Sequence, residues 1–218
     1  GSFVLFKKWG VIAGIAGALT YVYSPYIAYN LYIRGSLGEL VALGIIPWVF
    51  WALSSKKLLL SSILIAALII AHNVVAALFL PLIFMFLLWL FIETKRVEKK
   101  TFVICHLSFV ILALAASAFF WLPALAEYRF VRASQISVSD FGNEYLSFNN
   151  AFERTGIISV ITNLGLPLFF LTEGSKWFWD LFKSLQIIQF PWRLLSLFSF
   201  SAATVVSLVF KKLSTVKP

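Results

Sequence analysis

Charged side chains are scarce in this chain of 218 residues. Only 12% of the residues are charged and 61% are hydrophobic, whereas an ordinary soluble domain is about 25% charged. This composition leaves too little polar surface to cover a globular core. We therefore predict that lipid surrounds most of the protein, which excludes a compact water-soluble domain.

Side chains that bind metals or carry out catalysis are also few. Cysteine occurs once, at Cys105, which excludes an intramolecular disulfide and a cysteine-based metal site. Histidine occurs only at His72 and His106. The P-loop, GxSxG, HExxH and DxD patterns are all missing. The cofactor therefore stays unknown: a divalent metal is compatible with the function considered below, but no motif indicates one.

Long apolar runs are what the chain has instead. Residues 58–92 contain no Lys, Arg, Asp or Glu. A single helix of that length would measure ~52 Å, well beyond the ~30 Å hydrocarbon core of a bilayer. We therefore predict two membrane-crossing helices that fold back on each other at His72 and Asn73, with Asn73 as N-cap of the second.

Other apolar segments complete the predicted bundle. Four further spans are expected at residues 9–23, 37–53, 101–122 and 190–210. Residues 157–171 are short for a span and are interrupted by Asn163, Gly165 and Pro167, so we expect a re-entrant or half-inserted segment. The prediction is an all-α polytopic transmembrane bundle of about six full spans within one membrane domain, residues 1–218. Residues 176–188 are predicted to form an interfacial helix.

The net charge of +9 is concentrated at the ends of the apolar segments. The basic residues there are Lys7, Lys8, Lys56, Lys57, Lys95, Arg96, Lys99, Lys100, Lys211, Lys212 and Lys217. Short cytoplasmic loops retain Lys and Arg, so these ends are predicted to be cytoplasmic and to attract anionic lipid headgroups. By parity, residues 123–155 form an extracytoplasmic loop. No nucleic-acid-binding motif accompanies the charge, so nucleic acid is not an expected partner.

Small and aromatic residues mark the first span. Gly10 and Gly14 form a small-xxx-small pair to which Gly17 adds, so we expect another helix to approach closely there. Tyrosines at and after the end of this span are typical of an aromatic belt at the headgroups. They are Tyr21, Tyr23, Tyr26, Tyr29 and Tyr32.

Polar residues beside the apolar segments are the candidate site residues, because each is costly there. Glu39 follows Arg34 by five positions. One interpretation is a carboxylate that faces an external cavity, with Arg34 on a lipid phosphate; the other is an interfacial Glu favoured by the helix dipole. Arg193 opens the last segment and can reach a phosphate, pair with Glu127 or Asp180, or extend to the headgroups.

The tip of the apolar hairpin offers two more candidates. His72 can act as a base or bind phosphate, and Asn73 lies beside it. The alternative for His72 is a polar cap at the interface, because no partner carboxylate accompanies it in the sequence.

Four pieces of the sequence occur in a distinctive combination. They are SPYIAYNLYIRGSLGEL, AHN within the apolar hairpin, FWLPALAE, and SKWFWDLFKSLQIIQFPWRLLSL. The combination resembles the bacterial and archaeal multi-pass membrane family described as "6-pyruvoyl-tetrahydropterin synthase related domain", whose members are similar to GT-C glycosyltransferases. The resemblance covers most of the chain, and QFPWR and RGSLGE are its most specific pieces. It implies the plasma membrane of a prokaryote and a fragment of a longer GT-C-like protein.

The resemblance also implies an activity, the transfer of sugar from a polyprenyl-phosphate-linked donor at the outer face. Glu39 would then be the base or a metal-facing acid. Phosphate or substrate would be held by Arg34, His72, Asn73, Glu127 and Arg193. GT-C enzymes place an acidic motif in their first external loop, whereas residues 24–36 contain no carboxylate and only Glu39 lies close.

Two other functions remain open at this point. One is a non-enzymatic membrane scaffold or a subunit that handles lipid or polysaccharide. The other is a transporter, which ranks last because no broken helices recur in corresponding positions of two halves. Membrane lipid is the expected partner in every case, and the sequence specifies neither the sugar nor an oligomeric state.

Overall fold

The computed structural model describes residues 1–95, 98–127, 130 and 144–215. These residues are mostly helical and contain no strand, which confirms the all-α prediction. Five of the described segments are long and apolar enough to cross a membrane: Val11–Arg34, Leu37–Ser54, Asn73–Glu93, Lys99–Ala116 and Pro191–Thr215. The shorter apolar helix Leu58–Ala71 accompanies them. These are the features of an integral membrane protein.

The chain divides into two compact units, which we describe separately. Unit 1 comprises Gly1 and Val41–Glu127, and unit 2 comprises Ser2–Leu40 and Tyr128–Pro218. The predicted basic residues Arg96 and Lys217, and residues 128–129 and 131–143 of the predicted loop 123–155, lie outside the described residues.

The described residues of unit 1 form five α-helices. They are α4 (Leu37–Ser54, from Val41 onward), α5 (Leu58–Ala71), α6 (Asn73–Glu93), α7 (Lys99–Ala116) and α8 (Ala118–Ala126). Helix α5 packs against both α6 and α7. The Ser62 hydroxyl of α5 donates a hydrogen bond to the Phe109 carbonyl of α7 at 3.1 Å. The predicted span 101–122 is interrupted at Ser117, whose hydroxyl donates to the Ala113 carbonyl at 2.9 Å and so competes with the helix backbone.

The apolar hairpin forms as predicted, but its cap differs from the prediction. His72 is extended (φ −162°, ψ 103°) between α5 and α6, and its ring nitrogen Nδ1 accepts from the Val75 N–H at 3.2 Å. Asn73 is already the first helical residue, and its Oδ1 accepts from the Val74 N–H at 2.8 Å. The N-cap is therefore His72 and not Asn73, because only the residue before the first helical turn can take the extended conformation of a cap.

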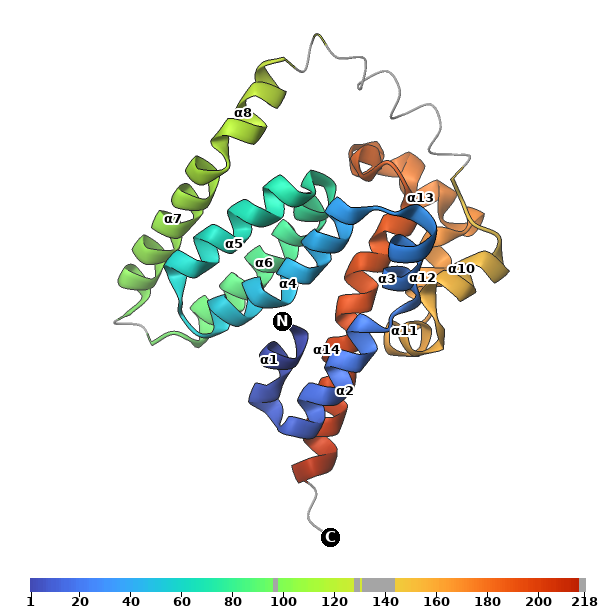
Figure 1. Cartoon of the computed structure of the whole chain (residues 1–218), viewed down its shortest axis with the longest axis horizontal. Coiled ribbons are helices and arrows are strands. Elements are labelled where there is room, and N and C mark those ends of the chain that lie inside the picture. The colour runs from blue at the N-terminus through green and yellow to red at the C-terminus, as the bar shows by residue number, and fades with distance from the viewer. Residues whose placement is uncertain (96–97, 128–129, 131–143, 216–218) are drawn as a thin grey trace. The chain divides into compact units, whose positions relative to one another are not determined.

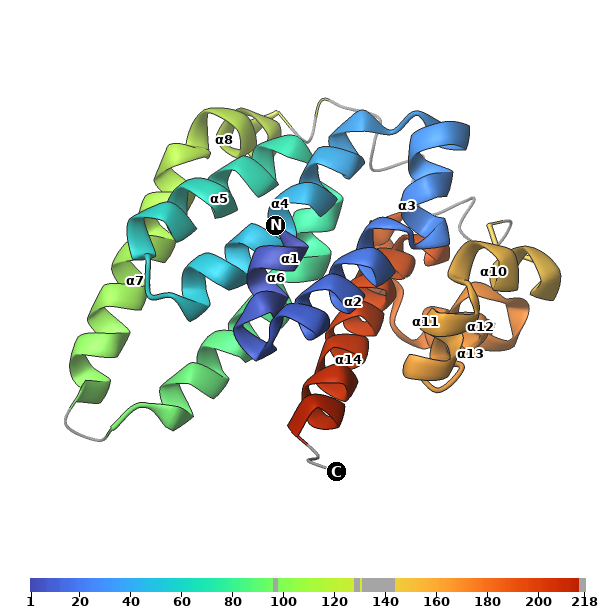
Figure 2. The same ribbon diagram turned by 60° about the horizontal axis from the view of Figure 1, so that its bottom comes forward.

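Unit 2 is organised around two antiparallel helices, α2 (Val11–Val22) and α14 (Leu195–Thr215), which lie side by side (Figure 1 and Figure 2). Toward one end, the Ser207 hydroxyl donates to the Ala13 carbonyl at 3.1 Å. Toward the other, the Ser24 hydroxyl donates to Ser199 Oγ at 3.0 Å. A short helix α1 (Ser2–Phe6) packs on α2.

Gly17 makes the close approach of α2 and α14 possible. A Cβ at this position would lie 1.8 Å from Ser207 Oγ and 3.0 Å from the Ala203 carbonyl oxygen. The predicted helix–helix contact at the small residues of the first span is therefore confirmed at Gly17, where only a hydrogen fits. The predicted pair Gly10–Gly14 does not meet another span: a Cβ at Gly10 would meet no atom within 4 Å, and one at Gly14 would meet Lys7 and Phe3.

The antiparallel pair places two lysine-rich ends together. Lys8, just before α2, repels Lys211 in the last turns of α14 electrostatically. If α2 and α14 each cross the bilayer once, the chain between them must cross an even number of times. Helices α4, α6 and α7 supply three crossings, so one more is required; α5 supplies it if the segment 157–171 does not cross.

The segment 157–171 forms two short helices and not a single span. Helix α11 (Ile157–Thr162) and helix α12 (Leu166–Leu171) are joined by a turn in which Leu164 (φ 54°) and Gly165 (φ 75°) are left-handed. Six helical residues rise only ~9 Å, so neither helix is long enough to cross a bilayer. The break agrees with the prediction that this segment does not form a full span.

Further short helices of unit 2 precede α14 in the chain, and of these α10 and η8 pack against it. They are α10 (Phe148–Thr155), η6 (Glu173–Ser175), α13 (Lys176–Leu181), η7 (Lys183–Ile188) and η8 (Pro191–Leu194). The predicted single interfacial helix 176–188 is wrong in its continuity, because Phe182 leaves helical geometry (φ −108°, ψ 58°) between α13 and η7. Within the predicted loop 123–155, the described residues belong partly to α8 and α10.

Candidate functional site

Five polar side chains of unit 2 converge at the end opposite the two lysine-rich ends. Tyr26 comes from α3 (Pro25–Tyr29), Asn30 and Arg34 from the π-helical turn η2 (Asn30–Arg34), Glu39 from the first turn of α4, and Arg193 from η8. We call this group the Arg34–Glu39–Arg193 cluster. It lies beyond the hydrogen bond that joins Ser24 to Ser199, and therefore away from Lys8 and Lys211.

Local backbone geometry brings the first four residues together. Ser24 caps α3, and its hydroxyl accepts from the Ile27 N–H at 3.4 Å. Tyr26, Asn30 and Arg34 then follow one another at intervals of four residues along α3 and η2. Gly35 ends the π-helical turn in the left-handed region (φ 61°), which glycine adopts without steric cost. The chain can therefore reverse into α4 and bring Glu39 back toward Arg34.

Glu39 is the centre of the cluster. Its side chain is fully buried, and Arg34 Nη1 donates to its Oε2 at 2.8 Å. The Tyr26 hydroxyl donates to Oε1, and Asn30 Nδ2 donates to the same oxygen at 3.3 Å. Arg34 Nη1 also donates to Asn30 Oδ1, so the amide bridges cation and carboxylate. Three donors and the N-terminal dipole of α4 together stabilise a buried negative charge.

Arg193 is the second cation of the cluster. Only 8% of this residue is exposed, and its Nη1 donates to the Ile188 carbonyl at 3.0 Å and to Gln189 Oε1 at 2.7 Å. Among the described residues, its Nε is buried without a hydrogen-bond partner. Arg193 interacts electrostatically with Glu39, Tyr26 and Arg34. Its hydrogen-bond acceptors are neutral, and the carboxylate that acts on its charge, Glu39, already pairs with Arg34.

Aromatic rings support both guanidinium groups. The Arg34 guanidinium lies 4.2 Å from the ring centroid of Trp192, and that of Arg193 lies 5.0 Å from the ring centroid of Phe190. The two rings stack on each other with centroids 4.8 Å apart and an interplanar angle of 12°. Stacking against π-faces stabilises cations that have lost water. The rings therefore hold both guanidinium groups in place.

Backbone strain occurs at the same place. Gln189, which accepts a hydrogen bond from Arg193, has a positive φ of 69° although it is not glycine. Such conformations cost on the order of 1–3 kcal/mol and concentrate at functional sites.

The structure brings three of the predicted site residues together: Arg34, Glu39 and Arg193. The carboxylate does not face an open cavity, as one interpretation of Glu39 had it, because its hydrogen-bond donors enclose it completely. Its position in the first turn of α4 matches the other interpretation. No ion pair joins Arg193 to Asp180 in the part of the chain that the structure describes.

The other predicted site residues belong to unit 1. His72 and Asn73 lie at the start of α6, where each accepts a backbone N–H, and Glu127 is an exposed residue that follows α8. The contact of His72, Asn73 and Glu127 with substrate stays a prediction. Among the described residues no group of three or more His, Cys, Asp or Glu side chains is placed to hold a metal ion.

Four residues of the site are missing from the sequence-based prediction: Tyr26, Asn30, Gln189 and Trp192. Tyr26 was assigned to the interfacial belt, yet it is 1% exposed, and Tyr21 is 3% exposed, so the belt assignment is wrong for both. Tyr23 and Tyr32, at 77% and 82%, are exposed as a belt requires. The four-residue spacing of Tyr26, Asn30 and Arg34 is the signal that indicates a shared helix face.

Comparison of the chain with known family models, with curated proteins and with solved structures finds no match.

Proposed function

We propose that this integral membrane protein binds the phosphate of a lipid-linked sugar at the Arg34–Glu39–Arg193 cluster and takes part in GT-C-like glycosyl transfer. The observation that carries the proposal is the buried Nε of Arg193, which has no hydrogen-bond partner in the part of the chain that the structure describes. An unsatisfied donor on a buried cation is costly, and a phosphate oxygen is a strong acceptor for it.

The charge balance of the cluster supports an anionic ligand. Two guanidinium groups and one carboxylate leave one net positive charge among groups that are mostly buried. An uncompensated buried charge destabilises the folded state. A bound phosphate would neutralise this charge and would accept hydrogen bonds from an already positioned arginine.

The position of the cluster supports an outer-face site. Lys8 and Lys211 lie at the opposite end of unit 2. The preference of cytoplasmic loops for lysine therefore favours a cluster on the outer side of a prokaryotic plasma membrane. This is the side on which GT-C-like proteins use polyprenyl-phosphate-linked donors, as the resemblance of the sequence implies.

We assign Glu39 a positioning role in this proposal. Its two carboxylate oxygens accept hydrogen bonds from Tyr26, Asn30 and Arg34, and no part of the residue reaches the surface. A general base must come within hydrogen-bond reach of a substrate proton. Glu39 instead fixes Arg34 against the Trp192 ring.

The enclosure of Glu39 also favours a second candidate function. A subunit that binds and presents a lipid-linked sugar without transferring it needs the phosphate site but no catalytic base. Transfer of a labelled sugar from a polyprenyl-phosphate donor to any acceptor would distinguish the enzyme from the handling subunit.

Phosphate binding can be tested with farnesyl phosphate as a probe and farnesol as its uncharged counterpart. In mild detergent, the wild-type protein is expected to bind the phosphate and not the alcohol. Arg193→Gln is expected to weaken phosphate binding by at least about tenfold, since a hydrogen bond to a charged group contributes about 1.5–3 kcal/mol. Arg193→Lys, which keeps the charge but lacks Nε, is expected to give an intermediate affinity.

A matched control is Lys183→Gln, an exposed cation in the neighbouring η7. This variant is expected to bind farnesyl phosphate as the wild type does. Circular dichroism and size-exclusion chromatography would establish that Arg193→Gln is folded. Equal binding of the phosphate by folded Arg193→Gln and wild type would refute the proposed site.

A further inference from the structure

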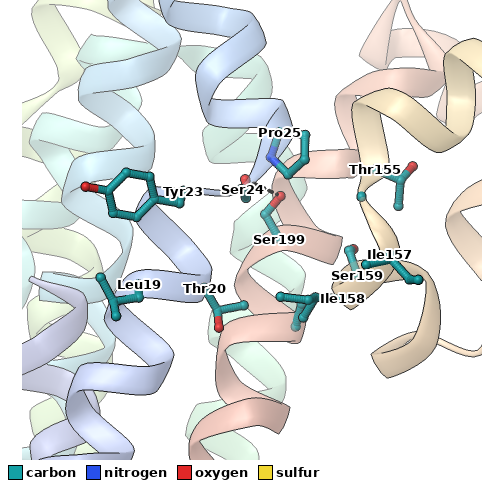
Figure 3. A pocket seen from close by; sticks show the side chains of 12 residues that line it. Leu19, Thr20, Tyr23, Ser24, Pro25, Thr155, Ile157, Ile158, Ser159 and Ser199 are labelled. Carbon is teal, nitrogen blue, oxygen red and sulfur yellow. Dashed lines mark hydrogen bonds between the residues drawn. The ribbon is translucent and has the colours of Figure 1, made fainter.

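A second feature of unit 2 is an apolar groove that lies outside the Arg34–Glu39–Arg193 cluster. Its volume is about 500 Å³, and it is bounded by the end of α2, the start of α3, the junction of α10 with α11, and α14 (Figure 3). Leu19, Ile157 and Ile158 on its rim are 52%, 60% and 50% exposed. Apolar side chains of α2 and α14, two helices of membrane-spanning character, would lie in contact with hydrocarbon.

Most of the hydroxyl groups that line the groove are engaged within the protein. Thr20 donates to the Ala16 carbonyl at 2.9 Å, and Thr155 donates to the Ala151 carbonyl at 2.6 Å. Ser24 and Ser199 bond each other, as the dashed line in Figure 3 shows. Polar groups that already have hydrogen-bond partners contribute little to the binding of a polar ligand. A hydrocarbon chain therefore suits the groove.

A second cavity of about 400 Å³ adjoins this groove and shares Pro25 with it. Most of its lining surface is apolar, Tyr29 of α3 and Tyr32 of η2 border it, and its charged residues are Glu153 and Arg154 of α10. The Arg154 guanidinium lies 4.2 Å from the ring centroid of Tyr29. Neither Glu153 nor Arg154 forms an ion pair in the described part of the chain. The Glu153 carboxylate and the Arg154 guanidinium, which are neighbours on α10, can therefore both pair with charged groups of a ligand.

Helix α10 carries the features of an element at headgroup depth. Phe148 and Phe152 are one helical turn apart and are 62% and 39% exposed. Tyr32, beside the same cavity, is 82% exposed. Exposed aromatic residues next to charged ones are typical of the boundary between hydrocarbon and headgroups.

We propose that the groove and the adjoining cavity bind one zwitterionic phospholipid. An acyl chain occupies the groove, the phosphate contacts Arg154, and the ammonium group contacts Glu153 and the faces of Tyr29 and Tyr32. Ion pairing and the attraction of ammonium groups to aromatic faces supply the recognition. Glu153 selects against an anionic headgroup, because a second negative charge beside its carboxylate is repelled.

Lipid retention by the purified full chain tests this proposal. The protein is exchanged into mild detergent with equal amounts of phosphatidylethanolamine and phosphatidylglycerol of the same acyl chains, and bound lipid is counted by native mass spectrometry. We expect about fivefold more phosphatidylethanolamine than phosphatidylglycerol on the wild type, the upper range for one partly exposed charge contact. Arg154→Gln is expected to lose both lipids, and Glu153→Gln is expected to hold both equally.

The groove is tested with a variant that narrows it. Ile158→Trp, at a half-exposed rim position, is expected to reduce retention of both lipids while the protein stays folded. Lys176→Gln and Asp180→Asn change exposed charges on α13 and are expected to retain lipid as the wild type does. Equal retention of the two lipids by the wild type, or unchanged retention by Arg154→Gln or by Ile158→Trp, would overturn the proposal.

Discussion

Arg34 and Glu39 form an ion pair across the left-handed turn at Gly35, with Arg34 Nη1 2.8 Å from Glu39 Oε2. The Glu39 side chain is fully buried, and that of Arg34 is 19% exposed. The pair joins the end of the π-helical turn η2 to the beginning of α4. It therefore fixes the geometry on which the proposed phosphate site depends.

Removing one partner of this pair should be strongly destabilising. Glu39→Ala leaves the Arg34 charge without its anion, and we expect the free energy of unfolding in detergent to fall by about 3 kcal/mol, the low end for a buried pair. The double variant Arg34→Gln with Glu39→Gln should recover part of this loss. Glu173→Gln, an exposed acid of the same unit, serves as the control. If Glu39→Ala lost no more unfolding free energy than Glu173→Gln, the pair would have no structural role.

The contact between α2 and α14 predicts a steric effect at Gly17. Gly17→Ala places a methyl group 1.8 Å from Ser207 Oγ and 2.7 Å from Phe6 Cδ2, so the helices must separate. We expect a loss of about 1–3 kcal/mol, measured by thermal or denaturant unfolding. Gly44→Ala in α4 is the matched control, because a Cβ there meets no atom within 4 Å and the substitution should raise helix stability. Equal effects at the two glycines would rule out this close approach.

The turn between α11 and α12 predicts a stabilising substitution. Leu164 has a φ of 54° and is 89% exposed, so its side chain gains little from packing while its backbone is strained. Leu164→Gly should raise the melting temperature, by an amount equivalent to about 1 kcal/mol. Gly165→Ala, at a φ of 75° with no atom near its Cβ, should lower it to a similar degree. A lower stability of Leu164→Gly would contradict the left-handed backbone conformation of Leu164.

Alkaline pH should destabilise the protein through Tyr145. Burial, and next the charges of Asp180 and Glu173, raise the pKa of Tyr145 above its usual value of 10.0. The folded state therefore keeps this phenol protonated in a pH range where the unfolded chain ionises it. The resulting stability is present below pH 10 and is lost as the pH rises further.

Melting temperatures recorded from neutral pH to above pH 10 test this contribution. Tyr145→Phe should reduce the alkaline decline. Asp180→Asn should make the decline smaller and complete it at a lower pH, because removing one repelling charge brings the folded-state pKa of Tyr145 closer to its usual value. A Tyr145→Phe curve parallel to that of the wild type would show that the phenol does not contribute.

Most of the helical architecture follows from the sequence because hydrocarbon-length apolar runs leave few alternatives. The hairpin at His72, the helix at residues 37–54 and the non-spanning character of residues 157–171 are examples. The close contact at Gly17 was indicated by the spacing of small residues. Interruptions were harder to predict: Ser117 and Phe182 break segments whose hydrophobicity continues unchanged across them.

The candidate site was only partly visible in the sequence. Arg34, Glu39 and Arg193 attract attention because charges are rare beside apolar segments. Tyr26 was missed because an amphipathic aromatic residue suits both an interface and a buried hydrogen bond to a carboxylate. The juxtaposition of Arg193 with Glu39 depends on packing between segments far apart in the chain, which no local pattern encodes.

The π-helical turn Asn30–Arg34 constrains the number of residues between Tyr26 and Glu39 as well as the identity of the site residues. Such turns hold one residue more than an α-helical turn does. Deleting a single residue between Tyr26 and Asn30 would swing every later side chain by about 100° around the axis relative to Tyr26. The Tyr26 hydroxyl would then point away from the Glu39 carboxylate although every functional residue was still present. Related chains that share this site should therefore conserve the number of residues between Tyr26 and Glu39 as strictly as the two residues themselves.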